Sequence, residues 1–395
     1  MEIKLGELIV NFDSKRRPLS KMIREQMKGP YPYYGAASIF DYINDYIFDG
    51  EYILLGEDGT VLEANGTPIL QLTKGKFWAN NHTHVLKNNE KLVDFKYLYY
   101  LLKNTVFSEI VTGAVQQKIS QGQMNSLLVD YNPDKKTQMK IASFLSSIDD
   151  KIDLNNKMNI NLEQQAVLIF NQLFLEGELK IDNEFGEISN SIIKRKIGSL
   201  DILITDFVAN GSFASLKENV KLYNSKEYAY FIRNTDLKSG VFEVFVDKHS
   251  YDFLSKSTLF GGEIIISNVG DVGSVFLCPT LDGPMTLGNN IIMLRPVNDN
   301  LRYYLYIWFK HSFGKNLIKG ITGGSAQPKF NKTDFRATSV LLPIDTDLFA
   351  FDENVSPLFE RIILNQEENK KLAELRNVLL PRLMSGKIDL EGIEI

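Results

Sequence analysis

Two segments of the chain carry the same long series of seam positions, and this repeat constrains the fold more than any other feature. In both segments the positions alternate steps of four and three residues, which is the heptad spacing of a coiled coil. The first series is Ile141, Leu145, Ile148, Ile152, Asn155, Asn159, Leu162, Ala166, Ile169 and Leu173. A shift of 210 residues gives the second series: Phe351, Val355, Leu358, Ile362, Asn365, Asn369, Leu372, Arg376, Leu379 and Leu383. The repeat predicts two related long helices that pair with each other.

Asparagine occupies the same two seam positions in both segments, as Asn155 and Asn159 in the first and as Asn365 and Asn369 in the second. A buried amide without a partner is costly, so seam asparagines penalise wrong registers at some cost in stability. If the two helices run antiparallel, Asn155 should lie near Asn369 and Asn159 near Asn365. We interpret the four residues as register pins.

Proline and glycine suggest where the two helices begin and end. Pro133 precedes the first predicted helix and Gly177 follows it. Ser356 and Pro357 suit the N-cap and first position of the second helix, since proline is tolerated in the first turn. Phe351 and Val355 are therefore expected to lie before that helix.

The regions outside these helices also repeat, in the same order. Lys4–Leu8 resembles Lys196–Leu200, Asn80–Asn81 resembles Asn289–Asn290, and Gly113–Ile119 matches Gly324–Phe330. The offset grows from 192 residues at Lys4 to 211 at Gly113, a difference that surface loops absorb. The repeat indicates that the two globular regions share one architecture.

We therefore expect an α+β fold with internal pseudo-twofold duplication. Two similar domains of mixed α/β structure should be separated by two long antiparallel coiled-coil helices. The expected order is a first domain at 1–133, a first helix at 134–177, a second domain at 178–349, and a second helix with a C-terminal tail at 350–395. A length of 395 residues agrees with more than one hydrophobic core.

Charge gives weak support for a nucleic-acid partner, because the net charge is −5. Residues 1–130 carry 14 basic and 15 acidic side chains, a balance of −1, and residues 185–345 carry 18 and 15, a balance of +3. No stretch approaches the ~18 apolar residues of a membrane span. The one cysteine, Cys278, cannot form an internal disulfide, so we expect a core position and a cytoplasmic protein.

Two apparent catalytic or metal motifs are better explained as structure. Asp149 and Lys151 follow Pro133 in an order that resembles a nuclease metal signature, but we expect them on the solvent-facing side of the first helix, whereas that signature belongs on strands. His82 and His84 alternate on one strand face, but four histidines and one cysteine supply no obvious further ligands. We expect neither a catalytic residue nor a bound metal.

The motifs and their order resemble a known family. Its features are matched by Tyr33–Ala36, Asp49–Gly59, Phe231–Leu237, the Gln-Pro-Lys loop at 327–329 and the ending Leu379–Ile388. Together with two domains alternating with two long helices, they resemble the DNA sequence-specificity subunit of type I restriction-modification systems over essentially the whole chain. The resemblance implies that each domain reads half of a bipartite double-stranded DNA target and that this chain has no active site.

The resemblance also implies partners. The helices would dock two methyltransferase subunits, which bind S-adenosylmethionine and methylate adenine, and a restriction subunit can join them. No cofactor is expected on this chain itself.

The repeated loop supplies the main candidates for DNA contact. Gln116 and Gln327 can each bond adenine with two hydrogen bonds, and Lys118 and Lys329 can neutralise phosphate. A polar turn that fixes a strand is the alternative. The first copy departs from the loop pattern, with glutamine at 117 where the second copy has proline at 328.

Three further residues are candidates for DNA contact. Asn81 and Asn290 end the repeated asparagine pairs. Arg233 can read guanine or hold Asp236, and their closeness in sequence favours the internal salt bridge.

Two other functions compete with this interpretation. An enzyme with methyltransferase activity would carry an Asn/Asp-Pro-Pro-aromatic loop, but no two prolines are adjacent in the chain. A coiled-coil scaffold without DNA binding would not need duplicated globular domains that are each longer than the helices. The specificity-subunit interpretation explains both observations.

Overall fold

The computed structural model describes residues 1–113, 116–176, 192–324 and 326–388. The chain divides into two compact units, a first unit of Met1–Asn155 with Glu367–Ile395 and a second unit of Asn156–Gln366. Each long helix therefore contributes to both units. Gly177, expected after the first helix, lies outside the described residues.

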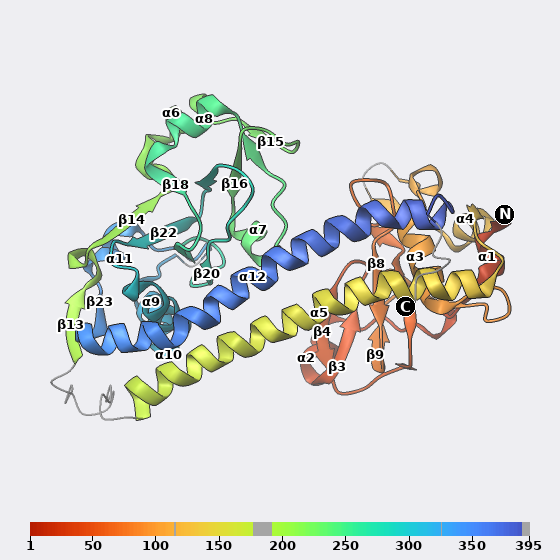
Figure 1. Cartoon of the computed structure of the whole chain (residues 1–395), viewed down its shortest axis with the longest axis horizontal. Coiled ribbons are helices and arrows are strands. Elements are labelled where there is room, and N and C mark those ends of the chain that lie inside the picture. The colour runs from red at the N-terminus through yellow and green to blue at the C-terminus, as the bar shows by residue number, and fades with distance from the viewer. Residues whose placement is uncertain (114–115, 177–191, 325, 389–395) are drawn as a thin grey trace. The chain divides into compact units, whose positions relative to one another are not determined.

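The first unit is built on a four-stranded antiparallel sheet of order β2-β10-β6-β8, beside a second sheet of order β4-β3-β9-β5. Its elements are β1 Glu2–Lys4, α1 Leu5–Leu8, β2 Ile9–Asn11, η1 Asp13–Lys15, α2 Lys21–Gln26, β3 Lys28–Tyr34, β4 Ile39–Ile43, β5 Phe48–Asp49, β6 Tyr52–Gly56, β7 Asp58–Gly59, β8 Leu70–Thr73, β9 Lys76–Ala79, β10 Thr83–Asn88, α3 Phe95–Asn104, η2 Ser108–Ile110, β11 Gln117–Lys118, α4 Gln121–Ser126, β12 Leu128–Asp130 and α5 Lys135–Asn171. In Figure 1 these elements run from red to yellow.

The second unit repeats this plan with a four-stranded antiparallel sheet of order β14-β22-β19-β20 and a five-stranded sheet of order β15-β17-β16-β21-β18. Its elements are η3 Gln172–Glu176, β13 Ile192–Lys196, η4 Ile197–Ser199, β14 Ile202–Asp206, η5 Phe207–Asn210, α6 Phe213–Asn219, β15 Leu222–Tyr223, β16 Ala229–Ile232, α7 Asn234–Ser239, β17 Phe245–Val246, α8 Lys248–Phe253, η6 Ser255–Ser257, β18 Thr258–Leu259, β19 Ile264–Ser267, β20 Val275–Leu277, β21 Met285–Leu287, β22 Ile291–Pro296, α9 Asn300–Lys310, α10 Ser312–Ile321, α11 Lys332–Ala337, β23 Ser339–Pro343 and α12 Asp345–Met384.

The two units share their strand order, and this confirms the predicted α+β fold with an internal duplication. β2, β10, β6 and β8 of the first unit correspond to β14, β22, β19 and β20 of the second. β12 returns to pair with β1, as β23 pairs with β13, so each globular part closes beside the strand with which it begins. Short helices follow both repeated loops, and side-chain caps start them: Ser120 and Gln123 form a capping box at α4, and Asn331 caps α11.

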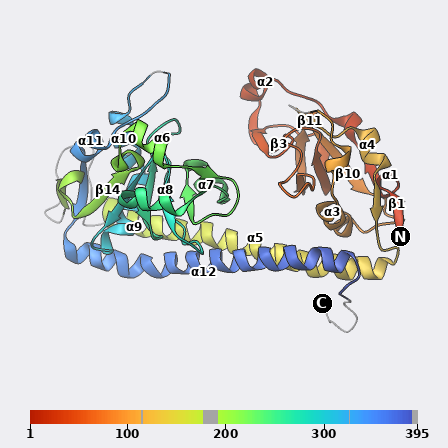
Figure 2. The same cartoon turned by 90° about the horizontal axis from the view of Figure 1, so that it is seen from above.

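The main core of each unit joins the antiparallel sheet to the long helices. The aromatic runs predicted to be core residues form α3 and α9, and Figure 2 shows α3 between β10 and the long helices. Tyr97 and Tyr304 are fully buried, and the hydroxyl of Tyr304 donates to Leu341 O at 2.6 Å. Cys278 is buried as expected.

The long helices run antiparallel within each unit. In the first unit, Asn155 Nδ2 donates to Asn369 Oδ1 at 2.9 Å, and in the second, Asn365 Nδ2 donates to Asn159 Oδ1 at 2.8 Å. These are the partners that the antiparallel register predicts. Asn155 and Asn365 are fully buried, so the same member of each pair is enclosed in both units. The register-fixing role of these asparagines stays a prediction.

The expected start of the second helix is wrong. α12 begins at Asp345, so Phe351 and Val355 lie inside it, both fully buried. Pro357 thus sits within the helix, where a missing N–H costs about 3 kcal/mol. The packing of Phe351 against Phe170 and Tyr304 offsets this loss. The cap residues in the sequence give no indication of these contacts.

The expected solvent-facing position of Asp149 is also wrong. Its carboxylate accepts a hydrogen bond from the hydroxyl of Tyr100 at 2.7 Å and one from Arg376 at 2.5 Å. Arg376 is the charged residue of the second seam, and Asp149 is the carboxylate of the apparent nuclease motif. The two residues form one ion pair. Lys151 pairs with Glu368 at 3.4 Å.

Candidate nucleic-acid interface

The repeated loop has the same backbone geometry in both units. Gly113 and Gly324 have φ values of 88° and 91°, a region that favours glycine. A Cβ atom at Gly113 would lie 2.1 Å from Gln116 O, and one at Gly324 would lie 2.6 Å from Gln327 O. The sequence match at these glycines therefore reflects a shared tight turn.

Matching backbone pairs hold the two loops in place. Thr112 pairs with Lys118 and Gly323 with Lys329, which closes each loop on itself. Lys118 also pairs with Asp58, and Lys329 with Val269. Gln116–Lys118 and Gln327–Lys329, called the readout segments for the DNA contact expected of them, are thus held in both units by the glycine-containing turn that follows β6 or β19.

All four loop candidates expose their side chains. Gln116, Lys118, Gln327 and Lys329 are exposed, so their amides and ammonium groups are open to a ligand. Lys118 Nζ lies 3.5 Å from Glu57 Oε1 while remaining half exposed. An exposed amide on a short, anchored strand can meet the edge of a base, and the lysine can meet phosphate.

Asn81 and Asn290 lie in the turns that lead into β10 and β22. Both side chains are exposed. Asn290 has a φ of 65°, and its carbonyl accepts from the backbone N–H of Asn268 at 3.0 Å. The Asn81 carbonyl accepts from Arg16 at 3.4 Å. Their backbones shape these turns, while their side chains remain open.

Arg233 forms the internal salt bridge that its spacing favours. Its guanidinium donates to Asp236 Oδ1 at 2.6 Å, and the carboxylate of Asp236 accepts from the backbone N–H of Arg233 at 2.9 Å. Bonding to Asp236 raises the pKa of Arg233. The guanidinium is thereby engaged in starting α7.

A buried charge cluster in the first unit was missed by sequence reasoning. His84, which is 1% exposed, faces Asp13 at 2.5 Å, and Arg16 donates to Glu57 at 2.5 Å. Burial acts to raise the pKa of Asp13, but the hydrogen bond and charge of His84, together with the hydrogen bonds from Val85 N–H and Asn11, hold that pKa below its usual value. The close spacing of Asp13 and Arg16 is the local signal that could have indicated the cluster.

Asp13, Glu57 and His84 also place their ligand-type atoms close enough to surround a cation. Arg16 already supplies the positive charge at this point, 3.5 Å from Asp13 and 2.5 Å from Glu57. The cluster is therefore explained as an ion-pair network. His82 does not belong to it and instead faces Asp58 at 2.6 Å.

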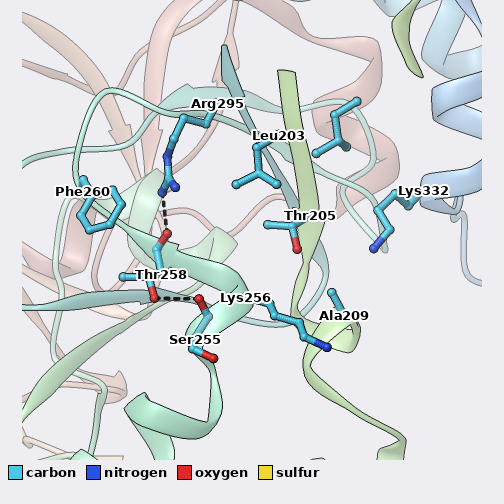
Figure 3. Close-up of a pocket in the computed structure, with 10 residues that line it drawn as sticks. Leu203, Thr205, Ala209, Ser255, Lys256, Thr258, Phe260, Arg295 and Lys332 are labelled. Carbon is cyan, nitrogen blue, oxygen red and sulfur yellow. Dashed lines mark hydrogen bonds between the residues drawn. The ribbon is translucent and has the colours of Figure 1, made fainter. Parts of the chain in front are cut away.

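The second unit contains a cationic pocket of about 460 Å³ that the sequence did not suggest. Lys256, Arg295 and Lys332 reach it from three different elements, together with the hydroxyls of Ser255 and Thr258 (Figure 3). Its other lining residues are Leu203, Ile204, Thr205, Ala209 and Phe260.

The three cations of this pocket differ in their partners. Arg295 donates to Thr258 O at 2.6 Å and to the carboxylate of Glu263, and Lys332 pairs with Asp206 at 3.0 Å. Among the described residues, Lys256 has no carboxylate partner for its ammonium group. A pocket with a free ammonium group and several hydroxyls suits a phosphate oxygen.

The long helices expose apolar side chains at matching positions. Leu154 and Leu364 are 54% and 55% exposed, and Leu168 and Val378 are 64% and 51% exposed. Both pairs are related by the shift of 210 residues that relates the helices. The two helices also expose the apolar side chains of Met139, Ile160, Phe349, Ile363 and Leu375, and extended apolar exposure of this kind is typical of a binding surface. Within the described part of the chain, no helix is long and apolar enough to cross a membrane.

Comparisons with known proteins agree with this architecture. The family model described as type I restriction modification DNA specificity domain matches residues 1–164 and 203–374. A putative type I restriction enzyme specificity subunit of Haemophilus influenzae is 25% identical over 95% of this chain and 94% of its own length. A type I restriction enzyme specificity subunit of Methanocaldococcus jannaschii is 26% identical over 95% and 90%.

Among solved structures, the type I restriction-modification S subunit from M. genitalium has a similar fold. The TM-score is 0.52 at 16% identity, and the match covers 97% of this chain and 96% of that one.

Proposed function

Because the chain belongs to the type I restriction-modification DNA specificity family, we propose that it reads a bipartite, asymmetric DNA target and directs partner subunits to it. One observation carries the proposal: two units of the same fold hold the same exposed readout segment with the same backbone pairs. The units are not identical in sequence, so each would read a different half of the target.

The readout segments supply the two kinds of contact that recognition requires. Gln116 and Gln327 would bond base edges in the major groove, where adenine presents a matching donor and acceptor. Lys118 and Lys329 would neutralise phosphates and fix the register on the duplex. Asn81 and Asn290 are exposed in the turns that precede β10 and β22 of the same units, and their side chains would add polar contacts. Arg233, which is bonded to Asp236, would hold the start of α7 in place rather than read a base.

The cationic pocket of the second unit would contribute a contact with the DNA backbone. Lys256 has no ion-pair partner among the residues that the structure describes, and Lys332 follows the readout segment by three residues. A phosphate bound there would add affinity without sequence information, as backbone contacts generally do.

The matched apolar positions on α5 and α12 would dock two copies of a methyltransferase subunit. In the first unit these positions are Leu154 on α5 and Val378 on α12, and in the second they are Leu168 on α5 and Leu364 on α12. S-adenosylmethionine would be bound by the methyltransferase subunits, and a restriction subunit would join the same assembly. This chain would be non-catalytic and would act in the cytoplasm.

Mapping of methylated adenines tests the proposal. The chain is produced with its methyltransferase partner in a host that lacks other adenine methylation, and the expected result is one split motif with a nonspecific gap. Gln116→Ala should relax one half of the motif and Gln327→Ala the other. Gln366→Ala, an exposed glutamine on α12, serves as the control and should change neither half.

Three outcomes would contradict the proposal. Methylation by the purified chain alone would show that it is an enzyme. An unsplit motif would exclude bipartite reading, and loss of both halves with Gln116→Ala would exclude one reader per half. An assembled complex without DNA affinity would favour a scaffold.

A further inference from the structure

The residue that follows each readout segment is held through its backbone carbonyl, and the two units use different side chains for this contact. In the first unit, His84 Nε2 lies 2.9 Å from Ile119 O. In the second, Asn268 Nδ2 donates to Phe330 O at 3.3 Å. Ile119 and Phe330 are equivalent in the repeat, and both are buried. The equivalent backbone oxygen is thus held in both units, by an imidazole in the first and by an amide in the second.

The neighbouring backbone contact explains why the side chains differ. The N–H of Ile119 donates to Glu57 O at 2.8 Å, and the N–H of Phe330 donates to Asn268 O at 3.1 Å, so Glu57 and Asn268 occupy equivalent places. Asparagine can also supply a side-chain donor to the carbonyl. An ionised glutamate at the same place can only accept, so the donor must come from elsewhere.

His84 is fixed so that it can donate to this carbonyl. Its Nδ1 lies 2.5 Å from Asp13 Oδ2 and 3.8 Å from Glu57 Oε2. The carbonyl oxygen of Ile119 only accepts, so Nε2 is the donor in this contact, while Nδ1 faces the carboxylate of Asp13.

The same network continues to the readout segment. Glu57 binds Arg16 through one oxygen and lies 3.5 Å from Lys118 Nζ through the other. His84 therefore touches the carbonyl that follows the segment, and its carboxylate neighbour touches a side chain of the segment itself.

We propose that His84 is the positioning residue for the first readout segment, with the role that Asn268 has for the second. The inference rests on the proposed DNA-reading function and assigns one anchoring side chain to each half of the target. Loss of either anchor should impair base discrimination in one half alone.

Two substitutions at His84 separate the two ring contacts. The amide nitrogen of glutamine reaches approximately as far as imidazole Nε2, whereas that of asparagine reaches approximately as far as Nδ1. His84→Gln should therefore keep the donor to Ile119 O, and His84→Asn should keep only the contact with Asp13. A residue needed merely for folding would not distinguish between these two variants.

The first measurement does not depend on DNA. In hydrogen–deuterium exchange of the full chain, His84→Asn should raise exchange of the Lys118 and Ile119 amides by about 3- to 10-fold, the effect expected for the loss of one hydrogen bond. His84→Gln should keep the parental rate. Equal rates in the two variants would overturn the inference.

The second measurement uses the complex with its methyltransferase partner and duplexes altered by one base in either half of the motif. His84→Asn should reduce discrimination about 3- to 10-fold in the first half alone, and Asn268→Asp should do so in the second half alone. Equal loss in both halves would overturn the positioning role. A parental complex without a split motif would refute the proposed function itself, whatever the exchange rates show.

Discussion

The buried asparagine of the first unit, Asn155, allows a prediction for two substitutions. Replacing it alone by alanine should destabilise the unit, whereas replacing it and its partner by leucine should not. Asn155 is fully buried and donates to Asn369 Oδ1 and to Glu368 Oε2, each at 2.9 Å. A neutral hydrogen bond contributes about 0.5–1.5 kcal/mol, and one to a charged group about 1.5–3 kcal/mol. Glu368 retains Lys151, so its share lies at the lower end. Asn155→Ala should lower the free energy of unfolding of the first unit by about 2 kcal/mol.

The double substitution Asn155→Leu with Asn369→Leu should have the opposite effect. It removes both amides of the Asn155–Asn369 pair together, and full burial of a leucine contributes about 1.5–3 kcal/mol, which offsets the loss of the donor to Glu368. It also removes Asn155 Oδ1, a buried oxygen without a hydrogen-bond partner in the described structure. The double variant should therefore be at least as stable as the parent.

Tryptophan fluorescence can assign each effect to a unit, because the chain has two tryptophans and each unit contains one. Trp78 of the first unit and Trp308 of the second are both buried. In a Trp308→Phe background, urea unfolding followed by Trp78 emission reports the first unit. Asn365→Ala, followed by Trp308 in a Trp78→Phe background, is the matched control in the second unit.

The result that would refute this reasoning is specific. An unchanged Trp78 midpoint for Asn155→Ala would show that the seam amide does not contribute to stability. A double leucine variant less stable than Asn155→Ala would show that the position requires polarity for another reason.

Four further predictions concern single sites. Burial and the nearby charge of Glu263 raise the pKa of the Cys278 thiol, so a thiol reagent should label the chain only as urea unfolds it; rapid native labelling would contradict this. The pKa of Asp13 is lowered in the folded state, so its carboxylate stabilises the fold above pH 3.8, and this contribution is lost as the pH falls through the folded pKa. In Asp13→Asn, the free energy of unfolding followed by Trp78 should therefore fall less steeply with decreasing pH, and an unchanged slope would contradict this. Lys256→Ala should reduce the slope of log binding constant against log salt by about 0.9, and an unchanged slope would exclude a phosphate contact. Leu154→Asp should weaken binding of one methyltransferase copy by about 10- to 100-fold, seen as a complex with one copy in mass photometry, while retention of two copies would exclude that docking surface.

The sequence predicted those parts of the molecule that repeat. A constant shift relates the two seams, and the antiparallel register then brings Asn155 to Asn369. The glycines at 113 and 324 indicated a turn because their backbone conformation leaves little choice of residue. These features depend on local geometry or on a long period, both of which are visible in one sequence.

The remaining features depend on contacts between distant residues. Cap residues suggested a helix start at Ser356, but buried contacts of Phe351 extend α12 back to Asp345. The spacing of the histidines drew attention to His82 and His84 equally, and burial against Asp13 and Ile119 distinguishes His84. The cationic pocket joins Lys256, Arg295 and Lys332 across separate elements, and no local pattern connects them.

The division of the chain into units also sets an order for its synthesis. The first unit's core joins Leu5 and Tyr97 to Leu380 and Leu383, which are synthesised after the whole of the second unit. At about 5–20 residues per second, the ribosome needs on the order of ten to forty seconds to make the intervening second unit. During that interval the first globular part has an incomplete core, because α5 has been made but α12 has not. The globular part that is translated first is therefore completed only after the second, and a chain shortened within the last turns of α12 should lose the fold of the first unit before that of the second.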